Sequence, residues 1–243
     1  MKTGPFVGII LIIVVIAAAL LVVFYPRTGG VGPATTATST TGTPSGTPAT
    51  SGFDQSISDG VITISYPSAM FGLATNPTQI LVHPYIPPCS GSFDYCFYYV
   101  GDEYQGTNFE SAGIRVETRA DLANERLCLT TPPQGFTTAV PSATSSADAY
   151  STSVFGNVGD AAAGHFSSGS LYRLYYRPSK ACYEFETRIG ESDYANYPSG
   201  TIGQFSAANQ AALQAALLQI LDGMTLPSST PVSFPTVTAA AGR

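Results

Sequence analysis

The hydrophobic pattern of the chain begins with one continuous apolar run, residues 6–25, which contains no charged side chain. A helix of this length spans about 30 Å, the thickness of the hydrocarbon layer of a bilayer. The apolar core of a cleaved signal peptide is shorter, about 7–15 residues, and ends in small residues. Here the run continues through Phe24, beyond the small residues at positions 17–19. We therefore expect residues 1–27 to form an uncleaved single-pass anchor, with the lipid bilayer as a partner through residues 6–25.

The pattern of the next segment, residues 28–52, has no periodicity and consists of Thr, Gly, Ser, Pro and Ala with one Val and no charge. Such a composition cannot bury enough apolar surface to form a fold, so we expect a disordered linker. A second low-complexity segment, residues 227–243, is expected to be a disordered tail. Lys2 precedes the apolar run, which favours a cytoplasmic N-terminus and an extracytoplasmic remainder.

The remaining segment, residues 53–226, has the size of one globular domain. Its first half alternates apolar and polar positions, as in residues 61–66, where Ile62 and Ile64 share a face. The other predicted strands are residues 71–74, 79–85, 97–100 and 112–118. A short helix is predicted over residues 122–128, with Asp121 as its N-cap.

The clearest strand pair is a hairpin over residues 171–189, with a turn around Pro178. The register that matches charge with charge places Arg173 opposite Glu186 on one face and Leu174 opposite Phe185 on the other. We expect the apolar face to be buried and the charged face to be exposed to solvent. Glu184 and Glu186 share that charged face beside arginines, so we interpret them as structural ion-pair partners rather than as a catalytic pair.

The last predicted element is a helix over residues 207–221, with Ser206 as N-cap and Gly223 just beyond its end. Its apolar stripe consists of Leu213, Ala216, Leu217, Ile220 and Leu221. Strands followed by one long helix, without regular βα alternation, predict an α+β fold. We expect an antiparallel sheet packed by a C-terminal helix and preceded by the transmembrane helix and the disordered stalk.

The charge of the predicted domain narrows the classes of partner. From residue 53 onward the chain has sixteen acidic and eight basic residues, a net charge of about −8. Nucleic acids and anionic lipid surfaces are therefore not expected to bind it.

All four cysteines of the chain lie in this acidic domain, and four cysteines allow three pairings. Cys89 and Cys96 bracket a short turn-rich loop, so we pair them locally and pair Cys128 with Cys182 by elimination. The alternative, a zinc site, is disfavoured because the chain has no C-x-x-C pair.

Known catalytic motifs are missing from the sequence. It contains no phosphate-binding loop, dinucleotide fingerprint, H-E-x-x-H, EF-hand loop or nucleophile elbow, so we assign no catalytic residue, metal or cofactor. One alternative stays open, a hydrolase of unrecognised type. Its Ser–His–Asp trio would consist of His165, Asp160 and one of Ser167, Ser168 or Ser170.

Aromatic residues gather around the Cys89–Cys96 loop and are the candidate binding residues. They are Tyr85, Phe93, Tyr95, Tyr98, Tyr99 and Tyr104. Tyrosine combines a large contact area with a polar tip, which suits the recognition of peptides or sugars. The alternative is that alternation through residues 95–99 buries about half of these rings in the core.

Five sequence segments, followed by the closing helix, resemble uncharacterised N-terminally anchored bacterial exported proteins. They are residues 60–74, GVITISYPSAMFGLA, residues 86–99, IPPCSGSFDYCFYY, residues 106–116, GTNFESAGIRV, residues 182–189, CYEFETRI, and residues 195–205, ANYPSGTIGQF. The GVITISYP opening together with the closing helix is similar to the PsbP-like α+β fold. The resemblance implies a fold and no activity. We expect a non-catalytic binding or envelope-associated module that binds a peptide, a glycan or an envelope protein.

Overall fold

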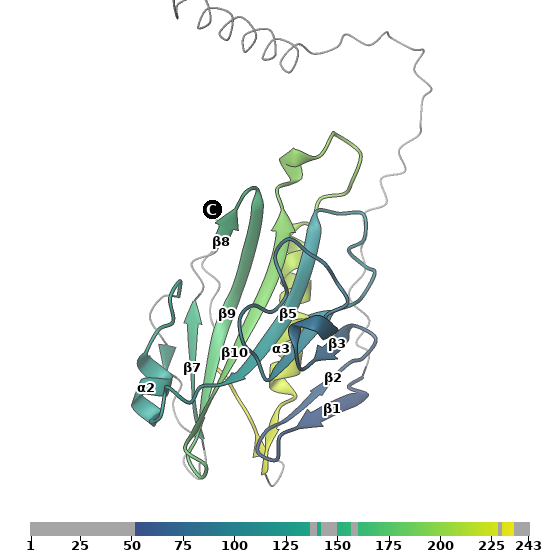
Figure 1. Ribbon diagram of the computed structural model, residues 1–243. Coiled ribbons are helices and arrows are strands. Elements are labelled where there is room, and N and C mark those ends of the chain that lie inside the picture. The colour runs from purple at the N-terminus through teal and green to yellow at the C-terminus, as the bar shows by residue number, and fades with distance from the viewer. Residues whose placement is uncertain (1–51, 137–139, 142–149, 157–159, 228–229, 236–243) are drawn as a thin grey trace, which may run out of the picture. The chain divides into compact units, whose positions relative to one another are not determined.

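The computed structural model describes residues 52–136, 140–141, 150–156, 160–227 and 230–235. These residues fold mostly into antiparallel sheets, with few helices (Figure 1). The expected anchor and linker, up to residue 51, lie outside this part of the chain. Within it, no helix is both long enough and apolar enough to cross a membrane.

The larger sheet carries most of the fold. Its strands, in spatial order, are β3 (Phe71–Ala74), β4 (Tyr95–Tyr99), β5 (Phe109–Thr118), β10 (Ala181–Ser192), β9 (His165–Tyr176), β7 (Tyr150–Gly156) and β6 (Val140–Pro141). A further strand, β8 (Asp160–Ala162), pairs with β9. The smaller sheet has the order β1 (Gln55–Ser58), β2 (Thr63–Tyr66), β11 (Thr225–Leu226) and β12 (Thr230–Pro231).

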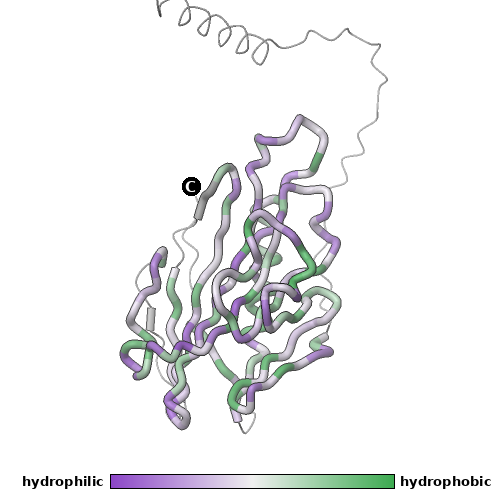
Figure 2. The backbone as a smooth tube through the Cα atoms, in the orientation of Figure 1, coloured by the Kyte–Doolittle hydropathy of each residue, from purple (hydrophilic) through white to green (hydrophobic). Residues whose placement is uncertain are grey.

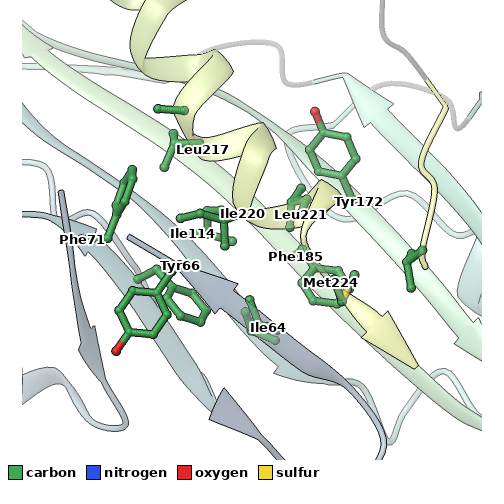
Figure 3. Close-up of a cluster of buried hydrophobic side chains, with 14 of the residues drawn as sticks. Ile64, Tyr66, Phe71, Ile114, Tyr172, Phe185, Leu217, Ile220, Leu221 and Met224 are labelled. Atoms are coloured by element: carbon green, nitrogen blue, oxygen red, sulfur yellow. The ribbon is translucent and has the colours of Figure 1, made fainter. Parts of the chain in front are cut away.

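The hydrophobic core lies between the larger sheet and a layer made by β2 and the long helix α3 (Ala207–Asp222). In Figure 1 α3 lies behind β5 and β10. Hydrophobic and hydrophilic positions are interleaved along the central strands, as Figure 2 shows, because alternate side chains point to opposite faces. Figure 3 shows Ile220 of α3 in one cluster with Ile114 of β5 and Ile64 of β2.

The structure confirms the predicted C-terminal helix and its apolar stripe. The Ser206 hydroxyl accepts a hydrogen bond from the Asn209 amide at 3.2 Å, which caps the first turn. Leu213, Ala216, Leu217, Ile220 and Leu221 are all buried. A period of 3.6 residues places these five side chains on one side of the helix, so the sequence pattern identifies the packed face.

The register of the β9–β10 hairpin differs from the predicted one by two residues. Arg173 lies opposite Glu184, not Glu186, and Tyr172 lies opposite Phe185. The turn begins at Arg177, whose carbonyl accepts a hydrogen bond from the Lys180 amide at 3.2 Å. This arrangement puts proline at the second turn position, which its fixed φ favours. Because a shift of two residues keeps every side chain on its face, the predicted division into an apolar and a charged face still holds.

One predicted strand of the first half is wrong, and the predicted short helix has different bounds. Residues 80–85, expected to complete a strand, form none, and only the short 3₁₀ helix η1 (Pro77–Gln79) precedes them. Proline at positions 84, 87 and 88 cannot donate to a strand ladder. The short helix begins later than expected, as α2 (Glu125–Thr130), with Asn124 and not Asp121 as its N-cap. Asp121 instead binds the Arg119 guanidinium, with an O–N distance of 2.8 Å.

The beginning of the expected C-terminal tail packs on the domain where the structure describes it. Strand β12 pairs with β11, and Val232 is buried in the core. The Thr152 hydroxyl donates to the Ser233 carbonyl at 3.0 Å. Residues 230–235 therefore belong to the fold rather than to a tail.

Candidate functional site

The charged face of the larger sheet is buried, which corrects the expectation of a solvated face. Arg173 and Glu184 each expose about 1% of their surface. Glu186 is also buried and binds Arg115 and Arg188, each at 3.1 Å. Within the described residues these charges satisfy one another, so the face has the character of an internal ion-pair network and not of a binding surface.

Helix α2 covers one end of this network. The Arg173 guanidinium donates to the Cys128 carbonyl at 3.0 Å, and the Cys128–Cys182 disulfide ties α2 to β10. Burial lowers the pKa of Arg173, and the adjacent Glu184 carboxylate opposes that shift. The second disulfide joins Cys89 and Cys96. Both predicted pairings are confirmed.

The six candidate aromatic residues divide into two groups. Tyr98, Tyr99 and Tyr104 are buried and pack in the interior, so they offer no binding surface. Tyr98 also donates its hydroxyl to the Gln79 carbonyl at 3.2 Å. Tyr85, Phe93 and Tyr95 remain partly or largely accessible. Burial along β4 does not alternate, because both faces of the strand are covered: Tyr99 lies in the main core, and Tyr98 packs with Cys89 and Cys96 in a second cluster.

Phe93 and Tyr95 line an open hollow of about 450 Å³. It lies at the Thr118 end of β5, where the β1–β2 turn meets the segment between the paired cysteines. The full lining is Asp59, Thr75, Phe93, Asp94, Tyr95 and Thr118. The volume is within the range of small-ligand sites, and the open shape suits a side chain that enters from solvent.

Backbone hydrogen bonds hold both carboxylates of the hollow in place. One oxygen of Asp94 accepts from the Thr118 amide at 2.6 Å, and the Asp94 amide donates to the Val116 carbonyl at 2.8 Å. One oxygen of Asp59 accepts from the amides of Val61 and Ile62, both at 2.8 Å. The two charges are therefore positioned by the ends of strands rather than by flexible side-chain contacts.

The electrostatics of the hollow are negative. Burial raises the pKa of Tyr95, and the charges of Asp59 and Asp94 raise it further. The pKa of the neighbouring Tyr183 is raised by burial first and by the same two carboxylates after that. Neither aspartate forms an ion pair with any residue that the structure describes. A cation entering the hollow would meet two uncompensated carboxylates.

The Ser–His–Asp trio considered above is not assembled around His165. The ring Nδ1 of His165 contacts Glu110, and no serine oxygen among the described residues is hydrogen-bonded to this ring. Ser168 accepts instead from Gln210 of α3 at 2.6 Å, on the opposite face of the sheet. Asp160 pairs with Ser167 through the backbone, and its side chain lies outside the described atoms. Among the described side chains, His165 is therefore paired with Glu110 and not with a serine that could act as a nucleophile.

Sequence reasoning identified the aromatic part of the hollow and missed its charges. No sequence motif marks Asp59, which precedes β2, or Asp94, which lies between the paired cysteines, as a binding residue. No spacing rule connects two aspartates 35 positions apart in the sequence. Among the residues covered by the structure, no group of three or more histidine, cysteine or acidic side chains could hold a metal ion.

Comparison with known proteins finds no family model that matches the chain and no curated protein with significant similarity to it. The hollow and the aromatic residues are therefore interpreted from their chemistry alone.

Proposed function

We propose that this chain is a membrane-anchored, extracytoplasmic and non-catalytic binding module, whose hollow binds a basic side chain of a peptide or envelope protein. The apolar run of residues 6–25 supports the anchor. The two disulfides support an oxidising compartment, since such bonds are rare in the cytosol.

One observation carries the binding proposal: two carboxylates held by backbone amides, Asp59 and Asp94, share a hollow with the rings of Phe93 and Tyr95. Neither has an ion-pair partner in the part of the chain that the structure describes. A lysine or arginine side chain has an apolar stem and a cationic end. The stem can pack along the rings, and the cation can meet the carboxylates and the ring faces. A neutral or anionic group gains none of the charge interactions.

The affinity of such a contact is modest. A cation about 4 Å from a carboxylate gains about 1–4 kcal/mol between the limits of bulk water and protein surface. An exposed cation–π contact adds about 0.5–1 kcal/mol. After the cost of association, we expect a dissociation constant of about 0.1–1 mM for a single basic residue. Tighter binding requires neighbouring contacts from a longer partner.

The experiment compares two peptides on the full-length chain in detergent. The first is a blocked glycine-rich peptide with one central lysine, and the second is the same peptide with acetyllysine, which has no charge. Titration calorimetry should show binding of the lysine peptide only, weakening with added salt. Asp94→Asn should reduce this binding about tenfold or more. Asp102→Asn, which removes an equal charge from a turn outside the hollow, should leave it unchanged.

Equal affinity for the two peptides would refute the proposal, because the cation would then have no role. Unchanged binding by Asp94→Asn would also refute it. In that case the peptide would occupy another surface of the domain.

A further inference from the structure

A second cluster lies at the other end of β5, around His165 and Tyr85. The Tyr85 ring stacks on the His165 ring, with centroids 3.8 Å apart and planes 15° apart. Yet Tyr85 exposes 59% of its surface. One face of the phenol ring is therefore covered by histidine, while the other face is open to solvent and has a fixed orientation.

Glu110 holds both partners of this stack. One of its carboxylate oxygens contacts His165 Nδ1, and the other accepts from the Ile86 amide at 3.3 Å, beside Tyr85. The Ser111 hydroxyl donates to the Ile86 carbonyl at 2.6 Å and anchors the same segment. Gly190 lets this segment lie flat on the sheet, because a Cβ there would be only 3.2 Å from the Ile86 Cβ.

A second exposed tyrosine belongs to the same end of the sheet. Ser192 lies opposite His165 in the β9–β10 pair, and its hydroxyl is 2.9 Å from the Tyr197 hydroxyl. Tyr197 itself exposes 39% of its surface and follows η2 (Tyr194–Asn196). The loop that carries it, between β10 and α3, forms the upper end of the domain in Figure 1. The cluster thus combines two exposed phenol rings with hydroxyl and imidazole groups.

We propose that this cluster binds a neutral sugar ring of an oligosaccharide. A pyranose ring has an apolar face of C–H groups, which can pack on the open face of Tyr85, and a rim of hydroxyl groups. The hydroxyls of the exposed Tyr85 and Tyr197 and the partly exposed His165 imidazole can exchange hydrogen bonds with that rim.

Among the described residues, two carboxylates at this end of the sheet are both engaged: Glu110 by His165 and the Ile86 amide, and Asp193 by the Ala195 amide at 2.9 Å. Neither forms an ion pair with a lysine or arginine of the described part of the chain. The cluster shares no residue with the hollow, so the inference does not rest on the basic-peptide proposal.

The pre-set ring orientation supports binding rather than core packing. Placing an exposed tyrosine flat against a partner restricts its side-chain freedom before any ligand arrives. A ligand that stacks on the ring then loses little free energy to the ordering of the tyrosine side chain. Aromatic residues in this arrangement are well suited to polar ligands that also have an apolar face.

The test uses the full-length chain in detergent with cellohexaose and chitohexaose as separate probes. The chain has no tryptophan, so its emission comes from its fourteen tyrosines, and the loss of a change in the Tyr85→Ala variant assigns that change to this ring. At least one of the two oligosaccharides should change the emission in a saturable manner. Tyr85→Ala should weaken that binding tenfold or more, whereas Tyr85→Phe should keep most of it, because the stacking face is retained.

Leu81→Ala is the matched control, because Leu81 is a highly exposed residue of the same loop that takes no part in the stack. It should bind the oligosaccharide as the unmodified chain does. Both exposed sites can be changed without opening the core, and a thermal melt checks that each variant is folded. Absence of saturable binding of both oligosaccharides to the unmodified chain would overturn the proposal. Unchanged binding by a folded Tyr85→Ala variant would overturn it as well.

Discussion

Arg173 lies directly opposite Glu184 in the β9–β10 pair, with its Nε and Nη2 atoms 2.8 and 2.7 Å from one carboxylate oxygen. The same carboxylate also accepts from Arg115 at 2.6 Å and from Arg119 at 2.8 Å. A single buried carboxylate therefore contacts three guanidinium groups, and for Arg173 it is the ion-pair partner among the described residues. The interior of the charged face depends on this one side chain more than on any single arginine.

Replacing Glu184 by alanine should lower the free energy of unfolding by about 3–5 kcal/mol, because Arg173 is left buried without its counter-charge. Urea unfolding at neutral pH measures the change. Asp121→Ala is the control, since Asp121 binds Arg119 but its side chain is 61% exposed. It should cost about 1 kcal/mol or less. Equal losses in the two variants would mean that the network is hydrated in solution.

The sequence predicts which side chains share a face but not which faces are covered. Periods of 2 and 3.6 residues place Leu174 with Phe185, and Leu213 with Leu217, on common sides. Charged side chains such as Arg173 and Glu184 predict a face that is exposed to solvent, because buried charges are rare. In this protein α2 covers part of the charged face. The alternation of residues within β9 and β10 cannot predict this, because α2 is distant from both strands in the sequence.

The candidate sites were less predictable for a related reason. Tyr85 and His165 meet only because Glu110 and Gly190 bring a proline-rich loop onto the sheet, and each of these four residues belongs to a different segment. Aromatic density in the sequence points to Phe93 and Tyr95 of the hollow and to Tyr85 of the cluster. Burial of such rings depends on strand register and on long-range packing, which a local pattern does not contain.

The two disulfides should contribute unequally to stability. On a chain-entropy model, the Cys128–Cys182 bond, with a sequence separation of 54, contributes about 4 kcal/mol, and Cys89–Cys96, with a separation of 7, about 2.5 kcal/mol. Replacing each pair by two serines and measuring urea unfolding tests the order. The longer pair also holds α2 over Arg173, so its loss should exceed that of the shorter pair. The reverse order would show that the unfolded chain is already compact around these residues.

Glu191 provides a test of pH dependence. It lies on β10 opposite Phe166 of β9 and Phe109 of β5, and its carboxylate has no hydrogen-bond partner among the described residues. Burial raises its pKa above the usual value of 4.5. The folded state therefore binds a proton more tightly at this site than the unfolded state does. As the pH rises through 4.5 the unfolded chain ionises first, so the site reduces stability progressively until the folded state has ionised too.

Glu191→Gln should therefore raise the urea midpoint at pH 7 and leave it nearly unchanged at pH 3.5, where the carboxyl is neutral in both states.

Glu125→Gln should instead lower the urea midpoint at pH 7. Hydrogen bonds from Arg177 and Ser151 lower the pKa of Glu125, so its contribution is present at pH 7 and is lost as the pH falls through the folded-state pKa. The changes in urea midpoint of the two variants should have opposite signs at pH 7 and should both become small in acid. This result would show that burial causes the pKa shift of Glu191 and that ion pairing causes the shift of Glu125. A lower midpoint for Glu191→Gln at pH 7 would mean that a partner stabilises the Glu191 charge, and that burial between the two phenylalanines does not dominate its ionisation.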